Sequence, residues 1–220
     1  MKRFLVINTK AKKNGVARRV ETIAKAARKY SKKGVEIILA VQTSDIMRIS
    51  KIVTTYAQHV DPIPYGSYTG WILPEAVKQA GAKGTLINHS EHKLDMKDIK
   101  KTIIRAREVG LKTLVCTSSI DEGRKIARLN PDFLAFEDPQ LIGTKKSVSE
   151  TEPETVKRFA DMVKRINPKI ISLCGAGIAD ANDVEAAIRL GTHGVLLSTA
   201  VVSAKSPSLA IKNLIGGMDV

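Results

Sequence analysis

The strongest constraint in this 220-residue sequence is a series of short apolar runs, rich in β-branched residues, that recur about every 27 residues. Most of the runs are continuous rather than alternating, which is typical of strands in a parallel sheet buried on both faces. We therefore expect eight parallel strands, of which the third is the weakest because proline interrupts it. The expected strands are Phe4–Ile7, Val35–Val41, His59–Ile63, Thr85–Asn88, Thr113–Cys116, Phe133–Phe136, Ile170–Cys174 and Gly194–Leu197.

In the segments between these runs, the apolar residues have the spacing of helices. Apolar residues recur at i, i+3, i+4 and i+7 in Ile99–Ala106 and again in Val156–Val163, with charged residues on the other face. Pro153, between two glutamates, is typical of a first helical turn. Glycines stand where three of the helices should end, at Gly34, Gly110 and Gly191.

Eight strand–helix units can form an open doubly wound sheet or close into a barrel. Glycine-rich turns follow the seventh run but not the first, and no GxGxxG follows the first strand, which weakens the dinucleotide-binding alternative. No linker, low-complexity tract or change of composition divides the chain. We therefore predict an α/β fold of the (β/α)8 TIM-barrel class, with eight parallel strands in a single domain spanning residues 1–220.

The net charge of +14 raises the question of a nucleic-acid partner. Basic residues are spread along the chain, however, without a long Lys/Arg block, and only 4% of residues are aromatic. This pattern argues against nucleic acid as the physiological partner, although a positive field also favours a small phosphorylated substrate.

Cysteine usage and hydropathy indicate the compartment. Cys116 and Cys174 both lie inside apolar runs, so we expect two reduced thiols in the core. The apolar stretch Phe4–Ile7 is too short for a signal peptide, and no segment approaches the roughly 20 apolar residues of a membrane span. We expect a cytoplasmic protein with no membrane partner.

Polar residues gather where the predicted strands end, which is where a (β/α)8 barrel carries its active site. These segments are Asn8–Lys10, Asn88–Glu91, Glu137–Pro139, Gly175–Gly177 and Ser198–Thr199. A single histidine at a strand end is more often structural. A lysine, a histidine and a carboxylate at three such ends, with glycines nearby, favour chemistry on one small molecule.

Three of these segments carry a family resemblance. Asn8-Thr9-Lys10, Asn88-His89-Ser90-Glu91 and Phe136–Thr144 resemble the signature segments of the triosephosphate isomerases, in the same order along the chain. Cys174–Gly177 and Leu197–Thr199 fall where that family has its phosphate-binding loops. The chain length and the segment Ile72–Val77 are similar to the compact archaeal branch.

The resemblance implies an isomerase of glycolysis and gluconeogenesis that interconverts dihydroxyacetone phosphate and D-glyceraldehyde 3-phosphate through an enediolate, without cofactor or metal. It implies that Glu137 is the base at carbon and that a neutral His89 is the electrophile. Lys10 would stabilise the developing charge and the substrate phosphate, Asn8 would orient the substrate, and Glu91 would anchor this cluster. A purely structural Lys10–Glu91 ion pair remains the alternative.

Phosphate binding and assembly also follow from the resemblance. Backbone amides of small residues would hold the phosphate, namely those of Gly175, Ala176, Gly177, Ser198 and Thr199. Pro139–Lys146 would form a lid, in which Ile142 and Gly143 close over the phosphate. Tyr65–Gly70 resembles the loop with which the family enters a partner subunit, which implies a homo-oligomer, with a dimer favoured and a tetramer possible.

Several residues depart from the family pattern. Asp138 stands where proline usually follows the catalytic glutamate, and Lys145 stands in place of a glycine, so both bear on lid motion. His92 replaces an arginine of the longer enzymes, and Ser198-Thr199 replaces Gly-Gly. Two other functions stay open from the sequence. One is another phosphate-binding barrel enzyme, acting for example on a phosphoribosyl or indole-glycerol compound, and the other is a catalytically idle basic barrel that binds nucleic acid or a protein through its charge.

Overall fold

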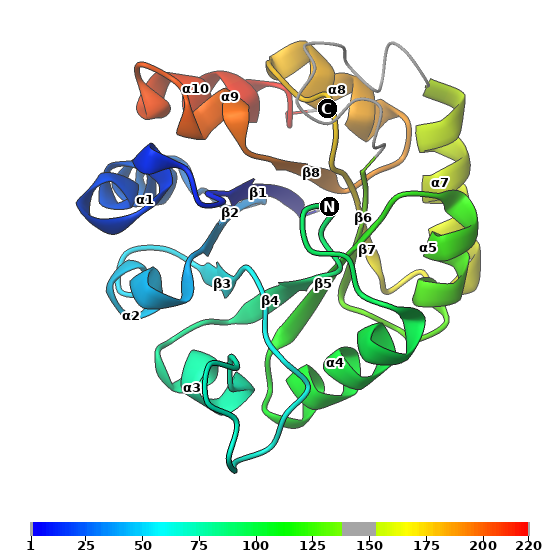
Figure 1. Ribbon diagram of the computed structural model, residues 1–220. Coiled ribbons are helices and arrows are strands. Elements are labelled where there is room, and N and C mark those ends of the chain that lie inside the picture. Colours follow the sequence, from blue (N-terminus) through cyan, green and yellow to red (C-terminus); the bar gives the residue numbers. More distant parts are fainter. Residues whose placement is uncertain (1, 138–152, 220) are drawn as a thin grey trace.

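A computed structural model of the chain describes residues 2–137 and 153–219. Parallel strands β1 to β8 form a closed barrel in sequence order, and helices surround it (Figure 1). The predicted (β/α)8 barrel is therefore confirmed. The strands are β1 (Arg3–Asn8), β2 (Val35–Val41), β3 (Thr55–Ala57), β4 (Gly84–Ile87), β5 (Lys112–Thr117), β6 (Phe133–Phe136), β7 (Ile171–Cys174) and β8 (Gly194–Leu197).

The helices lie between the strands and outside the barrel (Figure 1). Short 3-10 turns at Lys13–Gly15 and Thr43–Asp45 precede the first two. The α-helices are α1 (Ala17–Tyr30), α2 (Ile46–Ile49), α3 (Pro74–Gln79), α4 (Met96–Glu108), α5 (Ile120–Ala127), α7 (Pro153–Ile166), α8 (Ala181–Arg189), α9 (Thr199–Val202) and α10 (Pro207–Gly216).

The hydrophobic core has two layers, because the strands are buried on both faces. Phe4, Tyr56 and Phe133 pack edge to face inside the barrel with aliphatic side chains such as Leu86 and Leu173. A second layer lies between the strands and the helices. This burial on both faces explains why the strand sequences are continuously apolar.

The predicted periodicities agree with this packing. The apolar positions of Ile99–Ala106 and Val156–Val163 are the buried faces of α4 and α7. The predicted glycines follow α1, α4 and α8, and all three have a positive φ, which side chains other than glycine rarely adopt. Both cysteines are buried free thiols, as expected.

The third strand was predicted at the wrong place. It spans Thr55–Ala57, where Tyr56 lies opposite Ala40 of β2 and Gly84 of β4, whereas His59–Ile63 follows the strand. Pro62 has no N–H to donate to a strand ladder, so this run cannot continue the sheet. Instead, the backbone N–H of Asp61 donates to the carbonyl of Ile72 at 3.0 Å and closes the base of a long loop.

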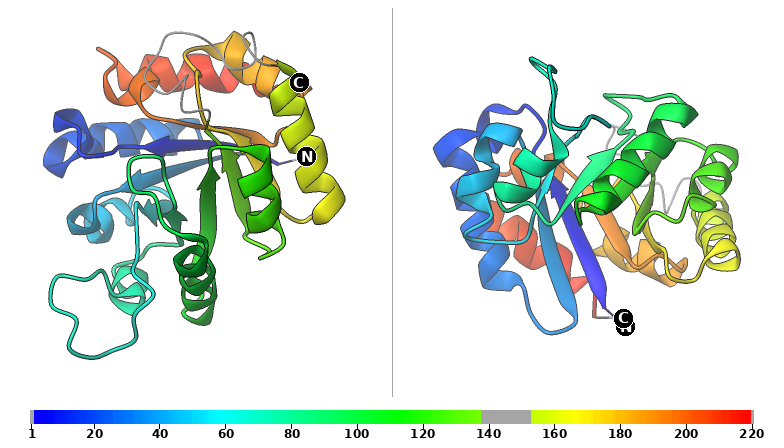
Figure 2. Two further views of the ribbon diagram at one scale, coloured as in Figure 1. Left: turned by 45° about the vertical axis from the view of Figure 1, so that its right-hand side comes forward. Right: turned by 90° about the horizontal axis from the view of Figure 1, so that it is seen from below.

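This loop between β3 and α3 projects from the body of the barrel (Figure 2). The exposed aromatic side chains Tyr65, Tyr68 and Trp71 lie on it, with 66% of Tyr65 and 56% of Trp71 open to solvent. The predicted Tyr65–Gly70 segment is therefore the outermost part of the loop rather than a part of the barrel core.

Candidate active site

A cavity of about 240 Å³ opens among residues that end or follow β1, β4, β6, β7 and β8, and so at the carboxyl end of the barrel. Since parallel strands of a closed barrel all end at the same rim, segments distant in sequence meet there. The predicted residues that line this cavity are Asn8, Lys10, His89, Glu137, Gly175, Ala176, Gly177, Ser198 and Thr199.

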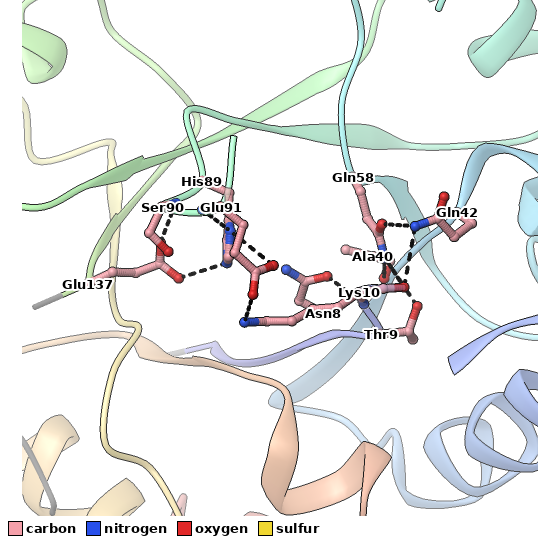
Figure 3. A network of polar contacts seen from close by, with 10 residues as sticks. All are labelled: Asn8, Thr9, Lys10, Ala40, Gln42, Gln58, His89, Ser90, Glu91 and Glu137. Carbon is pink, nitrogen blue, oxygen red and sulfur yellow. Dashed lines mark hydrogen bonds and ion pairs between the residues drawn. The ribbon is translucent and has the colours of Figure 1, made fainter. Parts of the chain in front are cut away.

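His89 and Glu137 face each other at one end of this cavity (Figure 3). The Nε2 atom of His89 lies 3.2 Å from Oε1 of Glu137, and both residues are buried. The Nδ1 atom of His89 accepts the backbone N–H of Glu91 at 3.1 Å. Because Nδ1 is an acceptor, a neutral ring carries its proton on Nε2 and donates it towards Glu137.

The position of Glu137 depends on its neighbours in β5 and β7. Glu137 is the first residue after β6, and its backbone N–H donates at 2.8 Å to the carbonyl of Thr117, the last residue of β5. A Cβ atom on Gly175 would lie 2.7 Å from Cγ of Glu137 and 3.0 Å from the carbonyl oxygen of Phe136, so only glycine fits here.

The Cys116 thiol lies near Glu137. Burial, reinforced by the Glu137 carboxylate, raises the pKa of this thiol well above its usual value and keeps it neutral.

The position of His89 depends on Asn88. This residue is buried with a φ of +60°, a conformation that asparagine tolerates better than most residues, and it turns the chain out of β4. Its Nδ2 donates to the carbonyl of Cys116 at 2.9 Å and to Glu122 Oε1 at 3.0 Å, while its Oδ1 accepts the N–H of Leu94 at 2.9 Å. The side chain thus ties the segment that carries His89 to β5.

Glu122, which accepts a hydrogen bond from Asn88, is the charged residue among those that hold the His89 segment in place. Burial would raise its pKa, but hydrogen bonds from Lys93, Ser118, Asn88 and Thr117 outweigh that effect and lower the pKa to about 2. The carboxylate is therefore ionised at any physiological pH and holds the turns after β4 and β5 together.

Lys10 and Asn8 approach the same cavity from β1 (Figure 3). Lys10 has a φ of +54°, and its N–H donates to Asn8 Oδ1 at 3.0 Å. The Nζ atom of Lys10 lies 2.8 Å from Oε1 of Glu91. This ion pair spans the barrel mouth, so the predicted residues Asn8, Lys10 and Glu91 form one connected group.

Two glutamines complete this group, and the sequence analysis did not identify them. Gln58 Nε2 lies within 3.3 Å of the Thr9 hydroxyl and of the carbonyls of Lys10 and Ala40, and Gln42 Nε2 donates to Gln58 Oε1 at 2.8 Å. These contacts support the left-handed turn at Lys10 (Figure 3). Gln58 follows β3, so the strand-end rule would have pointed to it if β3 had been correctly placed. Gln42 directly follows β2, whose position was predicted correctly, so the rule could have found Gln42 from the sequence.

Glu91 lines a second cavity of about 270 Å³, which adjoins the first at Asn8, Lys10 and His89. His92 lines it too and stacks on His59 with 4.3 Å between the ring centroids. Burial lowers the pKa of His59, although Asp61 at 3.2 Å opposes this effect.

The predicted lid, Pro139–Lys146, lies outside the described residues. This applies to Ile142 and Gly143, which were expected to close over the phosphate, and to the departures Asp138 and Lys145. Among the residues that are described, no group of three or more His, Cys, Asp or Glu side chains is arranged to hold a metal ion. No helix in the same part of the chain is long and apolar enough to cross a membrane.

A closed parallel barrel with a buried histidine, a buried glutamate and small residues around a cavity at its carboxyl end is typical of an α/β-barrel enzyme. The family model of triosephosphate isomerase matches residues 3–215. The chain belongs to the triosephosphate isomerase family and is an isomerase.

Triosephosphate isomerases of archaea resemble the chain over nearly its full length. That of Methanocaldococcus jannaschii is 45% identical over 215 residues, which cover 96% of this chain and 98% of that protein. That of Methanothermus fervidus is 41% identical over 218 residues, or 98% of each chain. That of Methanosarcina barkeri is 41% identical over 96% of this chain and 97% of its own length. The predicted resemblance to the archaeal branch is confirmed.

Proposed function

We propose that this isomerase interconverts dihydroxyacetone phosphate and D-glyceraldehyde 3-phosphate, with Glu137 as the base and His89 as the electrophile. The observation that carries the proposal is the buried pair of His89 Nε2 and Glu137 Oε1, 3.2 Å apart, at one end of a cavity with small residues at its other end. Family membership supports the reaction, and this geometry supports the two roles.

The proposed reaction moves one proton between two neighbouring carbons. Glu137 takes the proton from the carbon beside the carbonyl, and the electron pair of that C–H bond moves towards the carbonyl oxygen to form an enediolate. The Nε2–H group of His89 gives its proton to the carbonyl oxygen, and the nitrogen then takes the proton of the hydroxyl on the neighbouring carbon, so the O–H proton also changes place. Glu137 returns the first proton to the other carbon, and both side chains end the cycle unchanged.

Lys10 supplies positive charge where the enediolate forms. Its ammonium is held by Glu91, so it does not have to reorient when the substrate becomes negative. Asn8, which is buried beneath it, fixes the turn of Lys10 and orients the substrate. In this proposal, the Lys10–Glu91 ion pair positions a catalytic lysine.

The phosphate would lie at the turns that follow β7 and β8. Ala176 and Gly177 line the cavity and would offer their backbone amides, and Gly177 has a φ of +64° that favours glycine. Gly175 lines it too, but its N–H donates to the carbonyl of Phe136 at 2.7 Å, so its contribution is the space that its missing side chain leaves. Ser198 and Thr199 contribute two further amides, which explains how they can replace a Gly-Gly pair. We propose residues 1–220 as one catalytic domain.

The test is a coupled assay in which purified protein receives glyceraldehyde 3-phosphate and a dehydrogenase consumes the dihydroxyacetone phosphate formed. Turnover by the wild type that is lost in Glu137→Gln would support both the reaction and the base. Folded wild-type protein without turnover would contradict the proposed reaction and direct the search to other phosphorylated substrates.

We also infer a homo-oligomer, with a dimer as the minimal unit. The projecting loop exposes Tyr65, Tyr68 and Trp71, and large exposed aromatic side chains are typical of interfaces. Sedimentation of the wild type and of Tyr65→Ser tests this inference. A wild-type monomer would contradict it, and a tetramer would require a second interface.

A further inference from the structure

Lys12 extends from the turn after β1 towards α9. Its Nζ atom lies 2.8 Å from the hydroxyl of Thr199 and 3.4 Å from that of Ser203, and the side chain is half-buried. Thr199 lines the cavity beside Ser198. The ammonium group therefore lies next to the β8 side of the cavity, although the sequence analysis gave Lys12 no role.

The charge of Lys12 has no described counterion. Among residues 2–137 and 153–219, no carboxylate lies within 4.0 Å of its Nζ, whereas the neighbouring cation Lys10 is paired with Glu91. An ammonium has three N–H donors, and two of them have hydroxyl acceptors here. Its third donor and its full charge are thus available to an anion.

Ser198 gives a second, independent indication of a ligand at this place. Its Oγ atom is buried without a hydrogen-bond partner in the described part of the chain, yet the residue lines the cavity. Buried hydroxyls are normally paired, so an acceptor atom of a ligand would complete this one. A phosphate has enough oxygens to accept from Ser198 and from the ammonium of Lys12 together.

The pKa of Lys12 is consistent with a site that binds an anion. Burial, followed by repulsion from Lys10, lowers its pKa. A dianionic phosphate beside the ammonium would counteract both effects, since a nearby opposite charge favours the charged form of a group.

We propose that Lys12 is a phosphate-binding residue that contacts the substrate phosphate beside Ser198 and Thr199 and strengthens the preference for phosphorylated substrates. This inference rests on the proposed triose phosphate substrate and adds a side-chain cation to a site otherwise built from backbone amides. Lys12 differs from Lys10 in its task, because Lys10 serves the developing enediolate as well.

The test compares Lys12→Gln with Lys13→Gln. Lys13 is the neighbouring residue, is exposed and forms no ion pair with a described residue, so its substitution removes the same charge away from the cavity. Lys12→Gln should raise KM for glyceraldehyde 3-phosphate, and the inhibition constant of inorganic phosphate, by about tenfold each, the size expected for a charged hydrogen bond. Its kcat should change by less than about twofold, and Lys13→Gln should resemble the wild type.

Two results would overturn the inference. One is an inhibition constant for phosphate within about twofold of wild type in folded Lys12→Gln, a change too small for a lost phosphate contact. The other is a fall in kcat with unchanged phosphate binding, which would assign Lys12 the role of a tether between the β1 turn and α9. If the wild type binds phosphate but lacks isomerase activity, the proposed reaction fails, and calorimetry of phosphate binding to both variants still decides the role of Lys12.

Discussion

The two ends of the cavity are built in different ways. At one end, His89 and Glu137 are buried; the His89 ring accepts the N–H of Glu91 from its own loop, and the N–H of Glu137 donates to Thr117 of β5. At the other end, small residues after β7 and β8 line the cavity, and Lys12 lies beside it in contact with Thr199. A proton transfer requires specific functional groups at fixed distances, whereas a phosphate can be held by any suitable arrangement of amides and positive charge.

The largest effect is expected for Glu137→Gln, which removes the base and keeps the shape of the side chain. We expect kcat to fall by at least about a hundredfold, the lower limit for general-base catalysis. Binding of inorganic phosphate, measured by calorimetry, should stay as in the wild type because it concerns the other end of the cavity. Near-wild-type turnover would rule out Glu137 as the base, and weakened phosphate binding would contradict the separation of the two ends.

The next effect is expected for Asn88→Gly, which removes the hydrogen bonds that support His89 but retains a residue suited to a φ of +60°. We expect a loss of about 2 kcal/mol in the free energy of unfolding, because the Leu94 N–H and the Cys116 carbonyl lose their partner. Urea denaturation measures this loss. Asn88→Ala should lower the free energy of unfolding by about 1 kcal/mol more, since alanine is strained in the left-handed conformation. Equal stability of the two variants would show that this backbone strain contributes nothing.

Gly175→Ala connects the two ends, because its Cβ would press on Glu137 and on the backbone of Phe136. We expect kcat/KM to fall by about tenfold as the base shifts from its position. Gly216→Ala is the matched control, since a Cβ there meets nothing within 4 Å and the residue lies at the end of α10. Unchanged kinetics in Gly175→Ala would mean that the base does not depend on this close contact.

The smallest effect is expected for Glu122→Gln, and it depends on pH. The folded state lowers the pKa of Glu122 from 4.5 to about 2, so its ionisation stabilises the protein above pH 4.5, and this contribution is lost as the pH falls towards 2. We expect the variant to be less stable by about 1 kcal/mol or less at neutral pH, because the carboxylate is partly exposed and water screens its interactions. Thermal unfolding along a pH series should show this difference disappear in acid, and a difference that grows in acid would have the wrong sign.

The fold and most of the cavity could be predicted because they depend on local patterns. Continuous apolar runs defined most of the strands, and the strand-end rule located Lys10, His89 and Glu137 before any distance was known. The rule failed at β3, because the strand Thr55–Ala57 is only three residues long and was predicted at His59–Ile63 instead. Gln58 was missed for that reason, whereas its partner Gln42 follows the correctly placed β2 and was accessible to the rule.

The sequence by itself determined the barrel, the order of its strands and the residue types available at its rim, since periodicity and turn residues act locally. Only the tertiary structure decided which of these residues meet. The 3.2 Å contact between His89 and Glu137 depends on the closure of the barrel. Likewise, Lys12 reaches Thr199, 187 positions away, because β1 pairs with β8. Such contacts arise from strand register and burial across the whole sheet, which no local pattern of residues encodes.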